Sequence, residues 1–248
     1  MRAGRLVWGA VIFLAAIGSA VALRRMVHLV PVVIGGYSAP VVAANPALAQ
    51  LTALDDLFAR YAILTLVHIV PGLLFMVLGP WQFSATIRAR HLRWHQWNGR
   101  IFVFSGVVIG VSALVMSFAM PAIGGVNQAV ATTLFGAFFL IALGKAVWNI
   151  RRKEVALHRE WMIRAYAVGL AVATIRPIIG IFFATSRITG LTPHEFFGTA
   201  FWIGFTVQLM VAEAWIHWTA GVGKVQSRKS GHIEASIGRE ADSSLRSG

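Results

Sequence analysis

Residues 61–83, YAILTLVHIVPGLLFMVLGPWQF, form the apolar stretch that decides the fold class of this chain. The stretch contains no acidic side chain, lysine or arginine. Its length matches the roughly 20 residues that an α-helix needs to cross the ~30 Å hydrocarbon core of a bilayer. A helix is expected because it satisfies its backbone hydrogen bonds within the segment, where lipid offers no partner. We therefore predict a transmembrane helix here.

Other apolar runs of similar length lie on both sides of this stretch, at residues 6–23, 101–120, 129–150, 161–185 and 196–220. Overall, 57% of the residues are hydrophobic and 12% are charged, whereas a soluble domain has about 25% charged residues. So few polar side chains cannot cover a water-soluble globule. The sequence predicts an all-α integral membrane bundle of about six transmembrane helices in a lipid bilayer.

The chain has a net charge of +13. Its lysines and arginines cluster between the predicted spans, which is typical of signals for membrane orientation and not of nucleic-acid binding. Lysine and arginine cluster at 2–5, 88–100, 151–164 and 224–246. Alternating spans place these clusters on one side of the membrane. The segments on the other side contain only Arg24, Arg25, Arg60 and Arg187. By the positive-inside rule, we predict a bacterial inner-membrane protein with both termini in the cytoplasm.

The first apolar segment has two interpretations. Residues 1–25 form an N-terminal membrane anchor or, because Ala20-Val21-Ala22 follows the apolar run, a cleavable signal peptide, which would leave five spans. Residues 26–60 are then an extracytoplasmic segment with a short interfacial helix that starts near Asn45-Pro46. Residues 61–220 form a five-helix transmembrane domain. The polar tail at 221–248 is predicted to be disordered.

Polar residues inside the spans mark the candidate functional sites, because they are costly in lipid unless paired. His68 and Arg176 lie in the extracytoplasmic half of their spans. His68 shares a helical stripe with Gly72 and Gly79, which leave space either for a neighbouring helix or for a flat cofactor. We predict a buried polar site around His68 and Arg176, to which Arg100, Arg164 and Glu213 also belong.

A second set of polar residues lies near the cytoplasmic ends of the spans. His95, His158 and His217 are at comparable predicted depth and are candidate axial ligands of a haem b. Glu213 and His217 are four residues apart, so their side chains can meet on one helix face. This pair has a second interpretation, in which it neutralises Arg164 or Lys145 within the bundle.

The joint spacing of these polar residues resembles that of DUF2306, a family of uncharacterised bacterial polytopic membrane proteins. The resemblance covers about residues 58–220 and departs from the family pattern at Gln96 and Phe102, where that pattern tends to have arginine and tyrosine. It implies an architecture and a set of polar positions, but no activity. The matching positions are His68, Gly72, Gly79-Pro80-Trp81-Gln82-Phe83, Arg88, His95, Gly99-Arg100, His158-Arg159-Glu160-Trp161-Met162-Ile163-Arg164 and Arg176.

Three functional hypotheses follow. The polar layers hold a small molecule or a proton, as in a carrier; the chain is a b-type haem redox protein; or it is a non-catalytic membrane scaffold or assembly factor. The chain has no cysteine and none of the G-x-S-x-G, P-loop, H-E-x-x-H or dinucleotide-binding motifs. A classical enzyme is therefore not expected, although a redox role stays open. No metal site is predicted from the sparse acidic residues.

Overall fold

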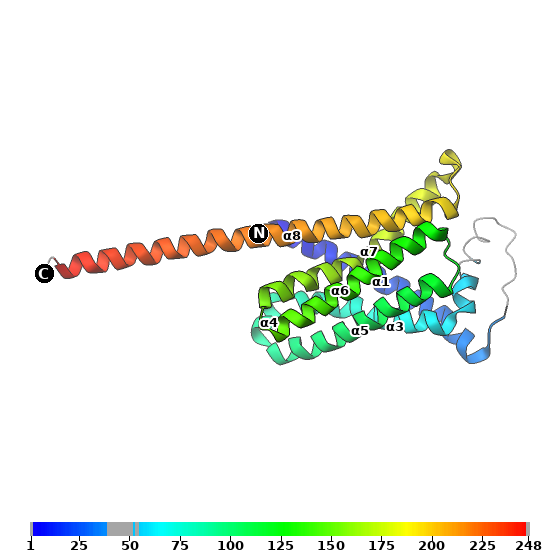
Figure 1. Cartoon of the computed structure of the whole chain (residues 1–248), viewed down its shortest axis with the longest axis horizontal. Coiled ribbons are helices and arrows are strands. Elements are labelled where there is room, and N and C mark those ends of the chain that lie inside the picture. Colours follow the sequence, from blue (N-terminus) through cyan, green and yellow to red (C-terminus); the bar gives the residue numbers. More distant parts are fainter. Residues whose placement is uncertain (1, 39–51, 53–54, 247–248) are drawn as a thin grey trace. The chain divides into compact units, whose positions relative to one another are not determined.

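The structure is a computed structural model that describes residues 2–38, 52 and 55–246. These residues contain helices and no strands (Figure 1). A short helical segment at 55–60 precedes α3. The named helices are α1 (Arg2–Gly35), α3 (Ala62–Phe83), α4 (Ala85–Arg90), α5 (Leu92–Ala119), α6 (Gly125–Arg151), α7 (Val155–Thr189) and α8 (Pro193–Arg246).

Six of the described helices are long and apolar enough to cross a membrane, which confirms the predicted fold class. Each covers one predicted apolar run, to within one residue at either end. The spans are Gly4–Gly35, Ala62–Phe83, Leu92–Ala119, Gly125–Arg151, Val155–Thr189 and Pro193–Gly221.

Several helices extend beyond their apolar runs. α1 continues through Arg24 and Arg25 to Gly35, past the boundary expected at residue 25, because arginine is a good helix former and both side chains find a carboxylate in Asp55. The start of the expected interfacial helix, Asn45-Pro46, lies outside the described residues. α8 continues as helix to Arg246, past the start of the tail expected to be disordered. The division of the chain into domains remains a prediction.

Consecutive helices pack beside one another: α1 on α3, α3 on α5, α5 on α6 and α6 on α7 (Figure 1). Short turns join α5 to α6 and α6 to α7, so these neighbours are antiparallel. Because α1 also contacts α7, the five helices form a closed ring. We call the end of this ring that holds segment 55–60 and the turn at 120–124 the Asp55 end. The opposite end, which holds α4 and the turn at 152–154, is the His95 end.

Small residues bring the helices of the ring close together. A Cβ atom at Gly106 of α5 would lie 2.8 Å from the Leu143 side chain of α6. On α7, Ala165 and Ala173 have no exposed surface. A Cβ at Gly169, between them in the same stripe, would overlap the ring of Phe75. The small residues Ala165, Gly169 and Ala173 therefore form a stripe of α7 that packs inside the bundle, as is usual for membrane helices.

Aromatic rings fill the centre of the ring of helices. Phe75 of α3 stacks on Phe102 of α5 with ring centroids 4.1 Å apart. It also meets Phe139 of α6 edge-on at 5.6 Å and Tyr166 of α7 at the same distance. Side chains from four helices thus meet around Phe75, which is 1% exposed.

The first part of α8, up to Leu209, belongs to the same compact unit as α1–α7. It packs on α6 through the stacked rings of Phe205 and Phe135 and bonds α7 through Gln208 and Thr174, 2.6 Å apart. At its start the Glu195 carboxylate accepts hydrogen bonds from the backbone N–H and from the hydroxyl of Thr192, each at 2.8 Å. Residues 210–248 form a second compact unit, which is helical to Arg246.

Candidate functional site

A cavity of about 290 Å³ lies within the ring of helices. This volume is close to the lower end of the usual range for small-molecule pockets, about 300–1,000 Å³. Its walls come from α1, segment 55–60, α3, α5, α6, α7 and the first part of α8. All these elements belong to the first compact unit.

The two ends of the cavity differ in chemistry. Toward the Asp55 end, its walls include Arg25, Thr65, His68, Gln128 and Arg176. Deeper along the same helices the lining side chains are apolar, among them Met76, Ile109, Phe139 and Val168. The cavity therefore has a cationic, polar end and an apolar end.

Arg176 projects from α7 into this cavity. Protein atoms crowd around its side chain, and the residue lines the cavity although part of its surface is exposed. Its guanidinium is near enough to that of Arg25 for the two charges to repel. Among the side chains that the structure describes, no carboxylate forms an ion pair with Arg176. An arginine remains charged in such surroundings, so Arg176 brings an unneutralised positive charge into the cavity.

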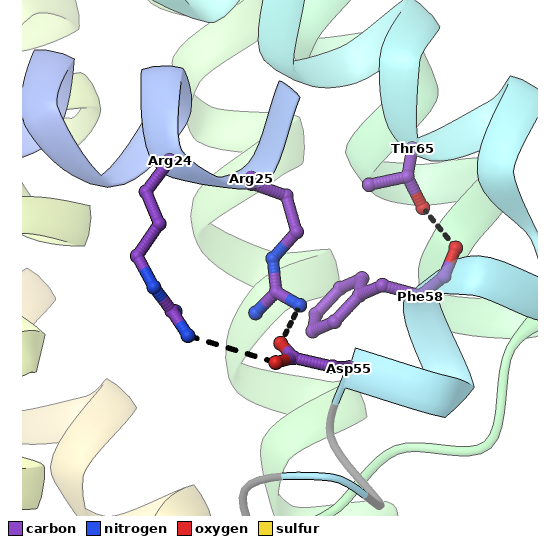
Figure 2. Close-up of polar contacts among 5 residues, drawn as sticks. All are labelled: Arg24, Arg25, Asp55, Phe58 and Thr65. Atoms are coloured by element: carbon purple, nitrogen blue, oxygen red, sulfur yellow. Dashed lines mark hydrogen bonds and ion pairs between the residues drawn. The ribbon is translucent and has the colours of Figure 1, made fainter. Parts of the chain in front are cut away.

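Arg25, by contrast, is neutralised. Its guanidinium pairs with the Asp55 carboxylate and lies over the Phe58 ring, 4.2 Å from the centroid (Figure 2). Arg24 reaches the other oxygen of Asp55 at 3.6 Å. Thr65 of α3 donates to the Phe58 carbonyl at 3.4 Å. These contacts fasten segment 55–60 to α1 and α3, and Phe58 forms part of the cavity wall.

His68 bridges α3 and α5 at the edge of the cavity. Its Nδ1 atom lies 3.0 Å from Oγ of Ser112. The Ser112 hydroxyl donates its one proton to a backbone carbonyl, that of Val108 at 2.6 Å, so its oxygen accepts the bond from His68. The proton of the neutral imidazole is then on Nδ1. This leaves Nε2 as the acceptor nitrogen of a residue that lines the cavity.

The two glycines of the stripe next to His68 differ in their surroundings. A Cβ atom at Gly72 would meet no atom within 4 Å, and Gly72 lines the cavity. A Cβ at Gly79, two turns further along α3, would overlap the ring of Tyr166. The first glycine leaves open space, and the second allows a neighbouring helix to pack closely.

The other arginines of the predicted polar site lie away from this cavity. Arg100 is exposed and lies over the Trp97 ring, 4.8 Å from the centroid. Arg164 pairs with Glu160 one turn earlier on α7, at 3.6 Å. Both stand nearer the His95 end of their helices. Arg164 lies 12 residues before Arg176, about 18 Å along α7 at 1.5 Å per residue, and Arg100 lies nine residues, about 14 Å, before Ile109, where the cavity lining on α5 begins. The predicted site is therefore divided, with His68 and Arg176 in the cavity and these arginines elsewhere.

Two of the three candidate haem ligands lie close to each other. His95 and His158, in the first turns of α5 and α7, are near enough to interact electrostatically, and Arg88 also acts on His95. His158 Nδ1 lies 2.8 Å from the Ala146 carbonyl, so this nitrogen carries the proton and Nε2 is left as a possible ligand atom. His95 Nδ1 is buried and has no hydrogen-bond partner among the described residues.

Glu213 and His217 belong to the second compact unit, at the i and i+4 positions of α8. Their predicted roles, with Arg164 or as a haem ligand, stay predictions. No group of three or more histidine or acidic side chains that could hold a metal ion is found among the described residues.

Two polar contacts were not predicted from the sequence. Asn98, at the start of α5, donates to Gln82 of α3 at 3.0 Å, and both side chains are buried. A Cβ at Gly99 would lie 2.7 Å from Gln82 Nε2. Asp55, which neutralises Arg25, was also missed. Its sequence signal is its charge in a segment that otherwise consists mainly of apolar residues.

These features define a multi-pass helical membrane protein with a partly polar cavity inside its bundle. The chain belongs to the DUF2306 family of predicted membrane proteins, whose model matches residues 65–216. The family assignment expected from the polar pattern is thereby confirmed. No curated protein and no solved structure shows significant similarity to the chain.

Proposed function

We propose that this protein binds an organic anion in the cavity, with Arg176 as the cation that recognises it. The proposal rests on one observation: a charged arginine lines a mainly apolar cavity and has no carboxylate partner among the described side chains. Placing an unpaired arginine near the centre of a membrane helix costs about 2.5–3.5 kcal/mol on insertion scales. A bound carboxylate or phosphate would offset this cost through paired, charge-assisted hydrogen bonds.

The described acidic side chains at the Asp55 end of the bundle already have other partners. Asp55 pairs with Arg24 and Arg25. Asp56 pairs with Arg60 at 2.9 Å, and Glu195 caps the start of α8. The sequence at 39–51 and 53–54 contains no aspartate or glutamate, so this part of the chain cannot supply a carboxylate side chain either.

His68 supports the same proposal. With Nδ1 bonded to Ser112, its Nε2 atom can accept a hydrogen bond from a hydroxyl group of the ligand. A ligand with both an anionic group and a hydroxyl group would therefore contact Arg176 and His68 together. This arrangement suits a carrier as well as a static binding protein.

We further infer that the chain lies in a bacterial inner membrane with both termini in the cytoplasm. The His95 end of the ring carries most of the lysines and arginines, at 88–100 and 151–164. The Asp55 end has Arg24, Arg25, Arg60 and Arg187. The positive-inside rule then assigns the His95 end to the cytoplasm.

The experiment is calorimetric titration of the purified protein, in a non-ionic detergent, with benzoate, dodecanoate and inorganic phosphate. At least one of these anions should bind, Arg176→Lys should bind it more weakly, and Arg176→Leu should not bind it. Arg187→Leu is the matched control, because Arg187 is an exposed arginine in the last turn of the same helix. If none of the three anions shows Arg176-dependent binding, the proposal is wrong and the scaffold hypothesis takes its place.

Haem binding is a second candidate, supported by the neighbouring imidazoles of His95 and His158. The hydrogen bond from His158 Nδ1 to Ala146 is the kind of contact that orients a metal-ligating histidine. Purification after expression with added haem should then yield a Soret band in the visible spectrum, which His95→Ala and His158→Ala would each abolish. Absence of the band from the wild-type protein would exclude this candidate.

A further inference from the structure

We infer that the occupant of the cavity is a single-chain amphiphile with an anionic head group, such as a fatty-acid-like carboxylate. This inference rests on the proposed anion binding and specifies the chemistry of the ligand. It uses two further properties of the cavity, which are its length along the helices and the separation of polar from apolar walls.

The cavity is elongated parallel to the helices. On α3 its walls run from Thr65 to Met76, and on α5 from Ile109 to Met120. Each stretch covers about 16 Å of helix axis at 1.5 Å per residue. An extended backbone advances roughly 1.2 Å per bond, so an extended alkyl chain of about a dozen carbon atoms fits this length.

The polar side chains of the lining lie toward the Asp55 end, where Leu57, Met116 and Met120 also line the cavity, and the deeper part is lined by apolar residues alone. Thr65 and Arg176 stand at the Asp55 end, whereas Met76, Ile109 and Val168 stand deeper. The rings of Phe75 and Phe139 line the deep end and are packed edge-on against each other. A small hydrophilic anion would leave this apolar part without a matching partner. An alkyl tail attached to the anion would fill it.

The volume favours one chain over two. At about 290 Å³, the cavity is near the lower end for drug-sized ligands, and its length already requires a long, narrow occupant. A phospholipid with two acyl chains would need a second channel of the same length. We therefore assign the cavity to a single-chain ligand and treat a two-chain lipid as an outcome of the test.

Gly72 provides a substitution that blocks the tail without disturbing the head-group site. A Cβ atom there meets nothing within 4 Å, and the residue lines the cavity, so a leucine side chain can occupy space that the tail would use. It lies one turn deeper on α3 than His68. Gly144→Leu on α6 is the matched control, because a Cβ at that exposed glycine also meets nothing within 4 Å.

The test measures the affinity of the purified wild-type protein for butanoate, octanoate, dodecanoate and hexadecanoate in non-ionic detergent. Free ligand is determined by equilibrium dialysis, so that partition into micelles is subtracted. Affinity should rise up to about fourfold for each methylene that enters the cavity and level off near a dozen carbon atoms. Gly72→Leu should weaken dodecanoate binding at least tenfold and leave butanoate binding unchanged. Gly144→Leu should behave as the wild type.

Three results would overturn the inference, and they distinguish it from the proposed function. Equal, Arg176-dependent affinity for butanoate and dodecanoate would leave the anion site standing and exclude the tail. Stronger competition by phosphatidate in nanodiscs than by dodecanoate would identify a two-chain ligand instead. If none of the four fatty acids, benzoate or phosphate binds in an Arg176-dependent manner, both proposals fail together.

Discussion

The guanidinium of Arg25 pairs with the carboxylate of Asp55 at the polar end of the cavity (Figure 2). The pair joins α1 to a segment 30 residues further along the chain and neutralises one of the two arginines that line the cavity. The charge of Arg176 is thereby left as the main attraction for an anion. An anionic ligand must compete with the Asp55 carboxylate for Arg25.

Asp55→Asn should therefore strengthen the binding of an anion in the cavity. Removing this negative charge lets Arg25 attract the ligand. For charges that interact across a partly polar cavity, we expect about a five- to tenfold gain in affinity for dodecanoate. Calorimetric titration measures the gain, and thermal melting reports whether segment 55–60 remains attached. Weaker binding by a variant that melts like the wild type would contradict the charge balance proposed here.

Gly79→Val should strongly reduce the yield of folded protein. A Cβ at this position would overlap the ring of Tyr166, and forcing extra atoms into a packed core costs typically 1–3 kcal/mol, sometimes more. Size-exclusion chromatography and thermal melting in detergent measure the effect. Gly144→Val is the control, since its Cβ meets open space. Equal melting temperatures for both variants would show that α3 and α7 do not pack as described.

Gln82 and Asn98 should behave as a coupled pair. Gln82→Leu leaves the buried amide of Asn98 with the Leu78 carbonyl alone as acceptor, at 3.3 Å, and should lower the free energy of unfolding by about 1–3 kcal/mol. The double variant Gln82→Leu/Asn98→Leu should lose less than the sum of the single variants. Gln96→Leu, at an exposed position of α5, should have little effect. Strict additivity would argue against the hydrogen bond.

The proposed orientation can be tested with single cysteines, because the natural chain contains none. Leu191→Cys lies in the turn between α7 and α8, and Lys153→Cys in the turn between α6 and α7; both positions are exposed. In intact spheroplasts, a membrane-impermeant maleimide should label the cysteine at 191. The cysteine at 153 should react after the membrane is opened. The reverse pattern would place the termini outside the cytoplasm.

Asp56 should remain ionised to unusually low pH. The Tyr37 hydroxyl donates a hydrogen bond to its carboxylate, which, with Arg60, holds the pKa of Asp56 below its ordinary value of 3.8. Because the folded pKa is lowered, this contact stabilises the fold at neutral pH and is lost as the pH falls through the folded pKa, below about 4. Carbon-13 NMR of labelled aspartate should show a higher pKa for Asp56 in Tyr37→Phe. An unchanged pKa would exclude the hydrogen bond.

The sequence by itself determined the six helices and the positions of His68 and Arg176. In lipid each helix satisfies its backbone hydrogen bonds within its own segment, so a local apolar run is sufficient to specify a span. A polar side chain inside such a run is recognisable without knowledge of its neighbours.

Tertiary structure alone decided which of these residues meet. His68 and Arg176 line one cavity, whereas Arg100 and Arg164, grouped with them from the sequence, find partners at the opposite end of the bundle. The pairing of Arg25 with Asp55 and the hydrogen bond between Gln82 and Asn98 depend on how helices rotate and pack against each other. That rotation is set by contacts between glycines and bulky side chains on different helices. No single segment contains both partners of such a contact, so the cavity and the unneutralised charge of Arg176 follow from the packed bundle.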